Sequence, residues 1–82
     1  MPGAPRKQDR EPTTLFEAHE HLSRQRPSLD AKPLAWAAFH RRSAEVYARV
    51  ARVDLAHRHE AQSYASLETR RAGEIEDNPK HT

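Results

Sequence analysis

The sequence predicts an all-α protein in which a short helix over about residues 15–25 folds back on one long helix over about residues 31–72. Three observations lead to this prediction. Between Pro33 and Gly73 the chain has neither glycine nor proline, the residues that most often interrupt a helix. Apolar residues on both sides of Pro27 recur at spacings of three and four, which is typical of one helical face. Thirteen of the 82 residues are alanine, the strongest helix former.

The composition allows one small domain with a small core. Hydrophobic residues make up 35% of the chain, but apart from Met1 and the alanines only fifteen large apolar side chains remain. There is no cysteine, so neither a disulfide nor a thiolate metal site can support the fold. Small domains of this kind often depend on oligomerisation. We therefore expect self-association to complete the helical hairpin.

The chain divides into three parts. Residues 1–12 carry three prolines and a run of charged residues, which predicts a disordered arm with nothing to bury. Residues 13–73 form the helical hairpin domain, and Gly73 is the expected end of its long helix. Residues 74–82 are then a flexible tail.

The first helix has a clear start and a clear end. Thr14 and Glu17 match a capping box, in which each side chain bonds the backbone N–H of the other residue. Pro27 disfavours helical geometry at the preceding residue and so ends the helix near residue 25. Its apolar side chains are expected to dock on Trp36 and Phe39; they are Leu15, Phe16 and Leu22.

The long helix carries a seam with a near-heptad spacing, which we interpret as an interface. Its members are Trp36, Phe39, Val46, Val50, Val53, His57, Tyr64 and Leu67. The short helix can cover only part of this seam, so a second copy of the chain would cover the rest. An alternative is that Asp54 caps a third helix after a tight turn at 52–53. Because that turn contains no glycine, proline or asparagine, the unbroken helix is favoured.

A polar cluster lies in the middle of the same helix. Asp54, His57 and Glu60 follow one another at a spacing of three and could converge on one face. Imidazole and carboxylate groups are suitable ligands for zinc, iron or manganese, so these three residues are metal candidates. We favour a polar layer that fixes the register of the seam, and we expect no cofactor.

A second line of residues runs beside the seam at intervals of seven. Successive members of this line lie roughly 10 Å apart on a straight helix, too far for direct contact. We therefore interpret them as positions that flank the seam and pair with a partner. They are His40, Tyr47, Asp54, Ala61 and Glu68.

Charge and motifs limit the function classes. Net charge is only +2, and Glu45 interrupts the basic side of the long helix, so nucleic-acid binding is disfavoured. That basic side is formed by Arg41, Arg42, Arg49 and Arg52. No apolar stretch is long enough to span a membrane, and the N-terminus lacks the apolar region of a secretory signal, so we expect a cytoplasmic protein. The sequence contains no glycine-rich phosphate loop and no recognisable setting for a nucleophile, so it gives no indication of an enzyme.

The favoured function is therefore a non-enzymatic protein–protein interaction module, an adaptor or regulator that binds itself and another protein. Two alternatives stay open. One is a metal-binding helical protein that uses the histidine–carboxylate cluster. The other is a small nucleic-acid binder that uses a basic helix.

Three segments together resemble a family of short actinobacterial proteins of uncharacterised function. They are residues 17–20 (EAHE), the stretch from Trp36 through residues 41–47 (RRSAEVY), and the stretch from Asp54 through residues 57–61 (HRHEA). The resemblance covers about residues 13–72. It implies a small helical cytoplasmic protein and assigns no catalytic or binding residue.

Overall fold

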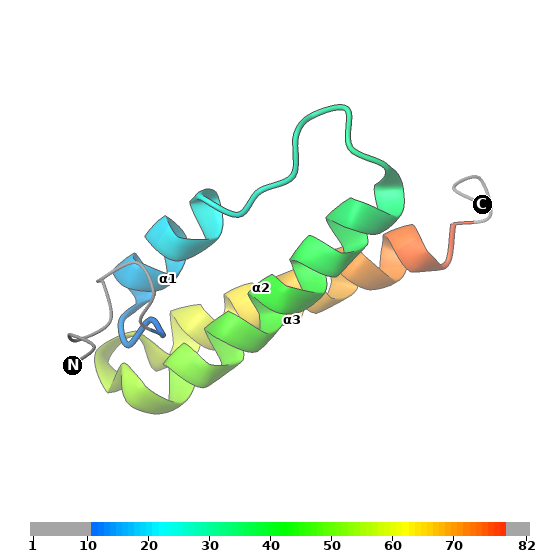
Figure 1. Ribbon diagram of the computed structural model, residues 1–82. Helices are drawn as coiled ribbons and strands as arrows, with labels where there is room; N and C mark the ends of the chain where they lie inside the picture. The colour runs from blue at the N-terminus through cyan, green and yellow to red at the C-terminus, as the bar shows by residue number, and fades with distance from the viewer. Residues whose placement is uncertain (1–10, 79–82) are drawn as a thin grey trace, which may run out of the picture.

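The computed structural model describes residues 11–78, which contain three helices. They are α1 (Leu15–Ser23), α2 (Pro33–Val53) and α3 (Arg58–Glu76), with one turn of 3₁₀ helix, η2 (Leu55–His57), between the last two. Figure 1 shows α2 and α3 as an antiparallel hairpin, with α1 lying along one part of it. The described residues contain no strand, which confirms the all-α prediction.

The prediction of one unbroken helix over residues 31–72 is wrong, because the chain turns back at Asp54. The backbone of Asp54 leaves the helical region (φ −97°, ψ 79°), and its N–H bonds the carbonyl of Val50 at 2.8 Å as the last bond of α2. Aspartate is a weak helix former, and packing two amphipathic helices buries apolar area that a single extended helix would leave in water. The alternative break near this residue was therefore the better prediction, although the Asp54 side chain does not cap α3.

The Asp54 side chain instead fixes the start of α1. One carboxylate oxygen, Oδ2, accepts a hydrogen bond from the backbone N–H of Leu15 at 2.8 Å. The expected capping interaction of Thr14 is confirmed, since its hydroxyl accepts from the N–H of Glu17 at 3.1 Å. The Glu17 carboxylate accepts from the N–H of Thr13 at 3.0 Å, one residue before the expected position. Two side chains thus satisfy N–H groups that a helix start would leave without partners.

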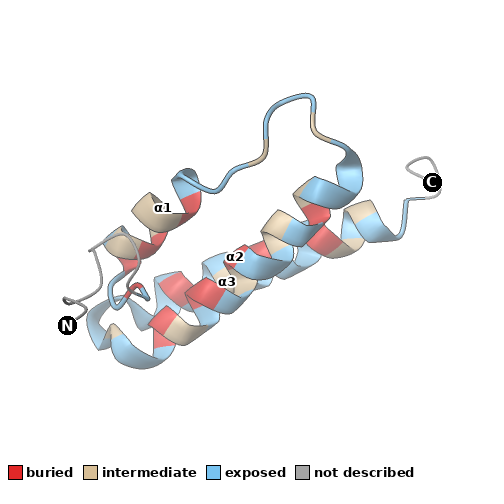
Figure 2. Ribbon diagram, in the orientation of Figure 1, coloured by how far each residue is buried: buried red, intermediate tan, exposed pale blue. Residues whose placement is uncertain are grey.

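The hydrophobic core lies where all three helices meet, beside the α2–α3 turn (Figure 2). Alanines at α1 and α3 positions let the helices approach closely. Phe39 and Ala65 pack against the edge of this core. The buried core residues are Leu15, Ala18, Leu22, Val46, Tyr47, Val50, Ala51 and Ala61. We call this part of the molecule the closed end, and the part where α2 begins and α3 ends the open end.

The docking of α1 differs from the expectation. Leu15 and Leu22 are buried, but Phe16 is 69% exposed, and Trp36 is not a member of the core. The segment of nine residues between Ser23 and Pro33 is long enough for α1 to settle on the second half of α2, away from Trp36. Phe16 follows the buried Leu15 directly, so on a helix it points to another side.

The boundaries of the domain also need correction. Pro12 is buried and Glu11 pairs with Arg49 at 3.1 Å, so these two residues of the expected arm belong to the folded part. Helix α3 continues through Gly73 to Glu76, because Gly73 does not take the positive φ that a helix-ending glycine adopts. Residues 1–10 of the arm and 79–82 of the tail lie outside the described residues.

Each helix of the described region is either too short or too polar to cross a lipid bilayer.

Candidate functional site

The fold divides the predicted interface residues between the core and the surface. Val46 and Val50 are buried within the chain, while Val53 is 55% exposed near the turn. The other members are partly or fully exposed and lie on different elements: Trp36, Phe39, His57, Tyr64 and Leu67. The seam is therefore not one continuous surface. The part that was expected to need a second copy, with Tyr64 and Leu67, lies on α3, which folds back and packs on α2.

The structure brings together two of the three metal candidates but not the third. Asp54 and His57 are in contact, with 3.0 Å between Oδ2 and Nδ1, but the Asp54 carboxylate also holds the start of α1. Glu60 is exposed on the first turn of α3. Within residues 11–78 no three histidine, aspartate or glutamate side chains are grouped so that they could share an ion.

The environment of Asp54 favours its charged form. The backbone N–H of Leu15, and then the imidazole of His57, lower the pKa of this carboxyl below its ordinary value of 3.8. Hydrogen bonds to a carboxylate stabilise its ionised state, which is why the pKa of Asp54 is lowered. The chemistry of Asp54 is therefore that of a structural acceptor.

Two of the four arginines of α2 pair with carboxylates of the same chain, and Arg52 is exposed near the turn. Arg41 donates through Nε to Glu76 at 3.0 Å, and Arg49 pairs with Glu11. Arg42 reaches the side chain of Gln25 at 3.4 Å. This face does not present a row of unpaired cations of the kind that binds a phosphate backbone.

Three rings, one from each helix, meet at the inner edge of the core. Tyr47 of α2 stacks on Tyr64 of α3, with 5.1 Å between ring centroids and 23° between planes. His19 of α1 stands edge-on to both tyrosines, at 5.4 Å and 4.9 Å. Its Nδ1 shares a hydrogen bond of 2.7 Å with the Tyr47 hydroxyl. This three-ring cluster joins α1 to the hairpin through polar as well as apolar contacts.

The Tyr47 hydroxyl is kept neutral by its surroundings. Burial, and to a lesser degree the nearby negative charge of Glu68, raise the pKa of Tyr47 to about 12. Desolvation disfavours a phenolate, as it does any charged group. Tyr47 thus acts as a hydrogen-bonding and packing residue at neutral pH.

Toward the open end, Glu68 of α3 is buried between two basic side chains. One of its oxygens contacts Nδ1 of His40 on α2, and the other accepts from Nη1 of Arg71 at 3.0 Å. Only 10% of the Glu68 side chain is exposed. A carboxylate at such burial needs these partners, because a buried charge without them is costly.

Sequence reasoning missed this Glu68 cluster although it noticed two of its members. His40 and Glu68 lie equally far along the chain on either side of Asp54, on the line with intervals of seven. On one straight helix they could not touch; in a hairpin that turns at Asp54 they face each other. The regular line was therefore a signal for the turn.

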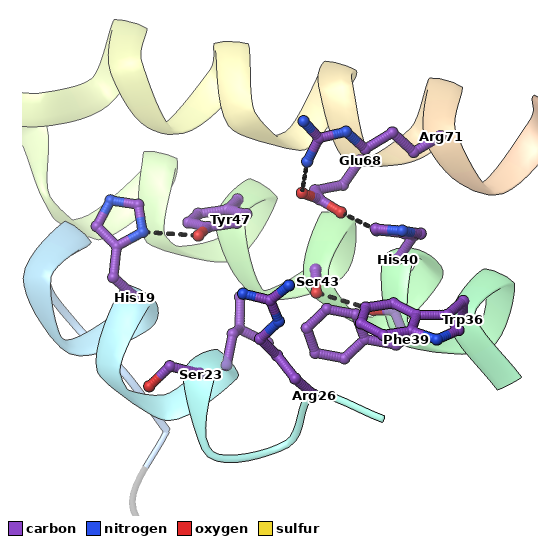
Figure 3. Close-up of a pocket in the computed structure, with 11 residues that line it drawn as sticks. His19, Ser23, Arg26, Trp36, Phe39, His40, Ser43, Tyr47, Glu68 and Arg71 are labelled. Atoms are coloured by element: carbon purple, nitrogen blue, oxygen red, sulfur yellow. Dashed lines mark hydrogen bonds and ion pairs between the residues drawn. The ribbon is translucent and has the colours of Figure 1, made fainter. Parts of the chain in front are cut away.

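Next to the Glu68 cluster is a groove of about 220 Å³ between all three helices (Figure 3). We call it the Trp36 groove. Trp36 and Phe39 form one wall, with their rings edge-to-face at 5.8 Å, and Arg26 places its guanidinium 5.6 Å from the Trp36 ring. The lining residues are His19, Leu22, Ser23, Arg26, Trp36, Phe39, His40, Ser43, Tyr47, Glu68 and Arg71.

The hydroxyl groups of the groove are already used by the fold. Ser43 donates to the carbonyl of Phe39 at 2.8 Å, and Ser23 donates to the carbonyl of Glu20 at 2.8 Å. Glu68 orients His40 in the way that an acid orients a general base, but no hydroxyl among the described lining residues is bonded to His40. The arrangement is suited to recognition through aromatic surface and charge.

Comparisons of the chain with protein-family models, with curated proteins and with solved structures found no match. The resemblance to short actinobacterial proteins therefore stays a prediction.

Proposed function

We propose that this protein is a non-enzymatic helical interaction module and that the Trp36 groove is its binding surface. The observation that carries the proposal is the position of Trp36. This large side chain is only partly buried, lies outside the core, and stands in a groove with an arginine over its ring. A fold of this size has few aromatic side chains for its core, and here its one tryptophan is half-buried outside that core.

The make-up of the groove supports a protein partner. Tryptophan, tyrosine and arginine are the residues that contribute most often to binding energy at protein interfaces. The groove contains Trp36 and two arginines, and Phe39 adds apolar surface, while the buried Tyr47 and Leu22 line it from the core. The hairpin behind them supplies a rigid support, which reduces the entropy lost on binding.

The structure changes the reason for expecting self-association. Self-association was expected because the second half of one long helix lacked cover. That half is α3, which packs on α2 within the chain. A second copy stays one possible partner for the groove. A cytoplasmic location and an adaptor or regulator role belong to the proposal as well.

Site-specific photo-crosslinking in cells tests the proposal. A benzophenone amino acid replaces Trp36 in one variant and Ala38 in a matched control, which is exposed on the same turn of α2 but does not line the groove. We expect a discrete adduct from position 36 and none from position 38. The protein in the adduct is then purified, and its binding to the unlabelled chain is measured by calorimetry.

Wild type should bind this purified partner, and Trp36→Ala should weaken binding by on the order of tenfold or more, as expected for a hot-spot residue. Circular dichroism confirms that the variant keeps its helices. Equal adducts at positions 36 and 38, or a partner that binds Trp36→Ala as tightly as wild type, would contradict the assignment of the groove.

A further inference from the structure

We infer that the Trp36 groove binds an acidic amphipathic helix of a partner protein, which lies on the hairpin in line with α1. This inference rests on the proposed function and names the kind of partner. Three observations carry it: the length of hairpin that α1 leaves uncovered, the charge of the residues that line the groove, and the position of Arg26.

The first observation is the mismatch in helix lengths. Helix α1 has 9 residues and α2 has 21, which correspond to about 14 Å and about 32 Å at 1.5 Å per residue. The groove begins at the last turn of α1, with Leu22 and Ser23, and continues beside the first half of α2. Some 18 Å of the two-helix face, enough for about twelve helical residues, thus extends past the end of α1.

The chain itself does not fill this space with its own apolar side chains. After α1 the backbone leaves the hairpin in a wide excursion and returns only at Pro33 (Figure 1). Leu29, in the middle of this segment, is 95% exposed, and Leu34 is 55% exposed. The face beside Trp36 therefore stays open to another helix, and α1 shows how a helix lies on this hairpin.

The second observation is an uneven charge distribution. Residues 24–43, which form the segment after α1 and the first half of α2, contain five basic residues and one acidic residue, Asp30. The end of α3 brings Glu74, Glu76 and Asp77 to the same end of the molecule, and Glu76 is paired there with Arg41. The rest of the chain has nine basic and eleven acidic residues. Among residues 11–78, Glu68 is the one carboxylate that lines the groove; one of its oxygens contacts His40 and the other accepts from Arg71. The groove itself is lined by Arg26 and Arg71, and its carboxylate is already paired, so it attracts negative charge.

The third observation is the state of Arg26. Its guanidinium lies over the Trp36 ring, and among residues 11–78 no carboxylate is paired with it. A guanidinium held on an aromatic ring keeps all its N–H donors for a carboxylate and can bind it in a bidentate manner. A partner helix could place a glutamate on the Arg26 guanidinium and leucine side chains on the rings of Trp36 and Phe39. It would then match both the charged and the apolar surface of the groove.

Fluorescence anisotropy with defined peptides tests the inference on the full chain. The probe is a fluorescein-labelled helical peptide of about twelve residues with leucines at helical spacing and glutamates elsewhere. A second peptide replaces every glutamate by lysine, and a third keeps the acidic composition but has a central proline that prevents a helix. We expect saturable binding of the acidic helix alone, with weaker binding at higher salt.

The variants Arg26→Glu and Arg24→Glu form a matched pair. Both reverse one exposed charge in the same segment, two residues apart, but only Arg26 lines the groove. Arg26→Glu should weaken the acidic helix by on the order of tenfold and gain affinity for the lysine peptide, because like charges repel and opposite charges attract across an interface. Arg24→Glu should change the affinity by less than about twofold, since a charge at the rim of an interface contributes little.

Several results would overturn the inference. Equal binding of the acidic and lysine peptides, equal effects of the two arginine variants, or full binding of the proline-containing peptide would each contradict an acidic helix in the groove. So would a labelled oligonucleotide that displaces the acidic peptide. A dimer in sedimentation analysis that Trp36→Ala dissociates would show that a second copy occupies the groove.

The outcomes separate this inference from the proposed function. If position 36 crosslinks to a partner whose contacting segment is basic or extended, the interaction module stands and the acidic-helix inference fails. If the acidic peptide binds as described but position 36 yields no specific adduct in cells, the chemistry of the groove is confirmed and the proposed function fails.

Discussion

The closed and open ends of this bundle differ in what covers the face of the α2–α3 hairpin. At the closed end, α1 completes the hairpin, and buried leucine, valine and alanine side chains fill the space between three helices. At the open end α1 is missing, and the hairpin presents Trp36, Phe39 and the Glu68 cluster to a groove. One end is built as a core, and the other has the aromatic and charged composition of an interface.

The difference follows from where the chain places its few large apolar side chains. A domain this small cannot fill two cores, and stability therefore concentrates where α1 can reach. At the open end the contact of Glu68 with His40 joins α3 to α2, and the apolar residues buried there are the small Ala37 and Ala72. The closed end should therefore govern folding, and the open end should be free to bind.

The largest expected effect comes from removing a core side chain at the closed end. Leu15 is 7% exposed, and Leu15→Ala should lower the free energy of unfolding by about 2–5 kcal/mol, as large-to-small core changes do. Trp36→Ala, at the open end, should cost on the order of 1 kcal/mol, because its side chain lies outside the core. Urea unfolding followed by circular dichroism measures both. Equal losses would mean that the open end is part of the folding core.

The second effect comes from ionising Tyr47 at the inner edge of the core. Its pKa is raised from 10.0 to about 12 in the folded protein, so the folded state favours the neutral phenol. The stability that this preference provides is fully present below pH 10 and is lost as the pH rises through about 12. This difference between the pKa of Tyr47 in the unfolded and folded states corresponds to roughly 2–3 kcal/mol of folding stability.

Alkaline unfolding of wild type and Tyr47→Phe checks this value, because phenylalanine does not titrate. The variant should lose less stability than wild type between neutral and strongly alkaline pH. Ultraviolet titration of Tyr64→Phe, in which Tyr47 is the one remaining tyrosine, reports the ionisation directly. A Tyr47 that titrates near its ordinary value would show that the closed end is open to water at this ring.

The sequence predicted the helical class and the start of α1 because these depend on local signals. The Thr14 cap, the alanine content and the absence of breakers all act within a few residues. The turn at Asp54 could not be read in the same way, because no glycine or proline marks it. It depends on a tertiary bond to Leu15 and on the burial gained when α3 packs on α2.

The candidate site was harder to predict for the same reason. His40 and Glu68 meet only after the chain turns at Asp54, and Arg26 reaches Trp36 only after the segment following α1 returns to the hairpin. The line of residues at intervals of seven through Asp54 places His40 and Glu68 at equal distances from the turn. In an unbroken helix this spacing does not bring the two side chains together. Trp36 was named as an interface residue from its position on the helix, and that assignment stays a prediction.

A smaller effect is expected from acid at the joint between α1 and the turn. The pKa of Asp54 is lowered, chiefly by the N–H of Leu15. Its contribution to stability is therefore present above about pH 4 and is lost as the pH falls through the lowered value. Thermal melting of wild type should decline more steeply from about pH 5 to pH 3 than that of Asp54→Asn, whose amide still accepts a hydrogen bond but does not titrate there. Parallel declines would mean that other carboxyls govern acid unfolding.

The smallest effect is expected in the last turns of α3, at the open end. Gly73 lies inside the helix with a negative φ, and a Cβ added there would meet nothing within 4 Å. Gly73→Ala should therefore raise the free energy of unfolding by about 0.5–1 kcal/mol, because alanine loses less backbone entropy than glycine in a helix. Leu15→Ala removes core contacts at the closed end, whereas this change leaves every core contact intact and acts only on the helix that carries Glu68. Urea unfolding should show a higher midpoint with an unchanged slope, together with unchanged affinity for the groove peptide. A lower midpoint would show that Gly73 is needed for a contact at the open end, and that the two ends are less independent than their construction implies.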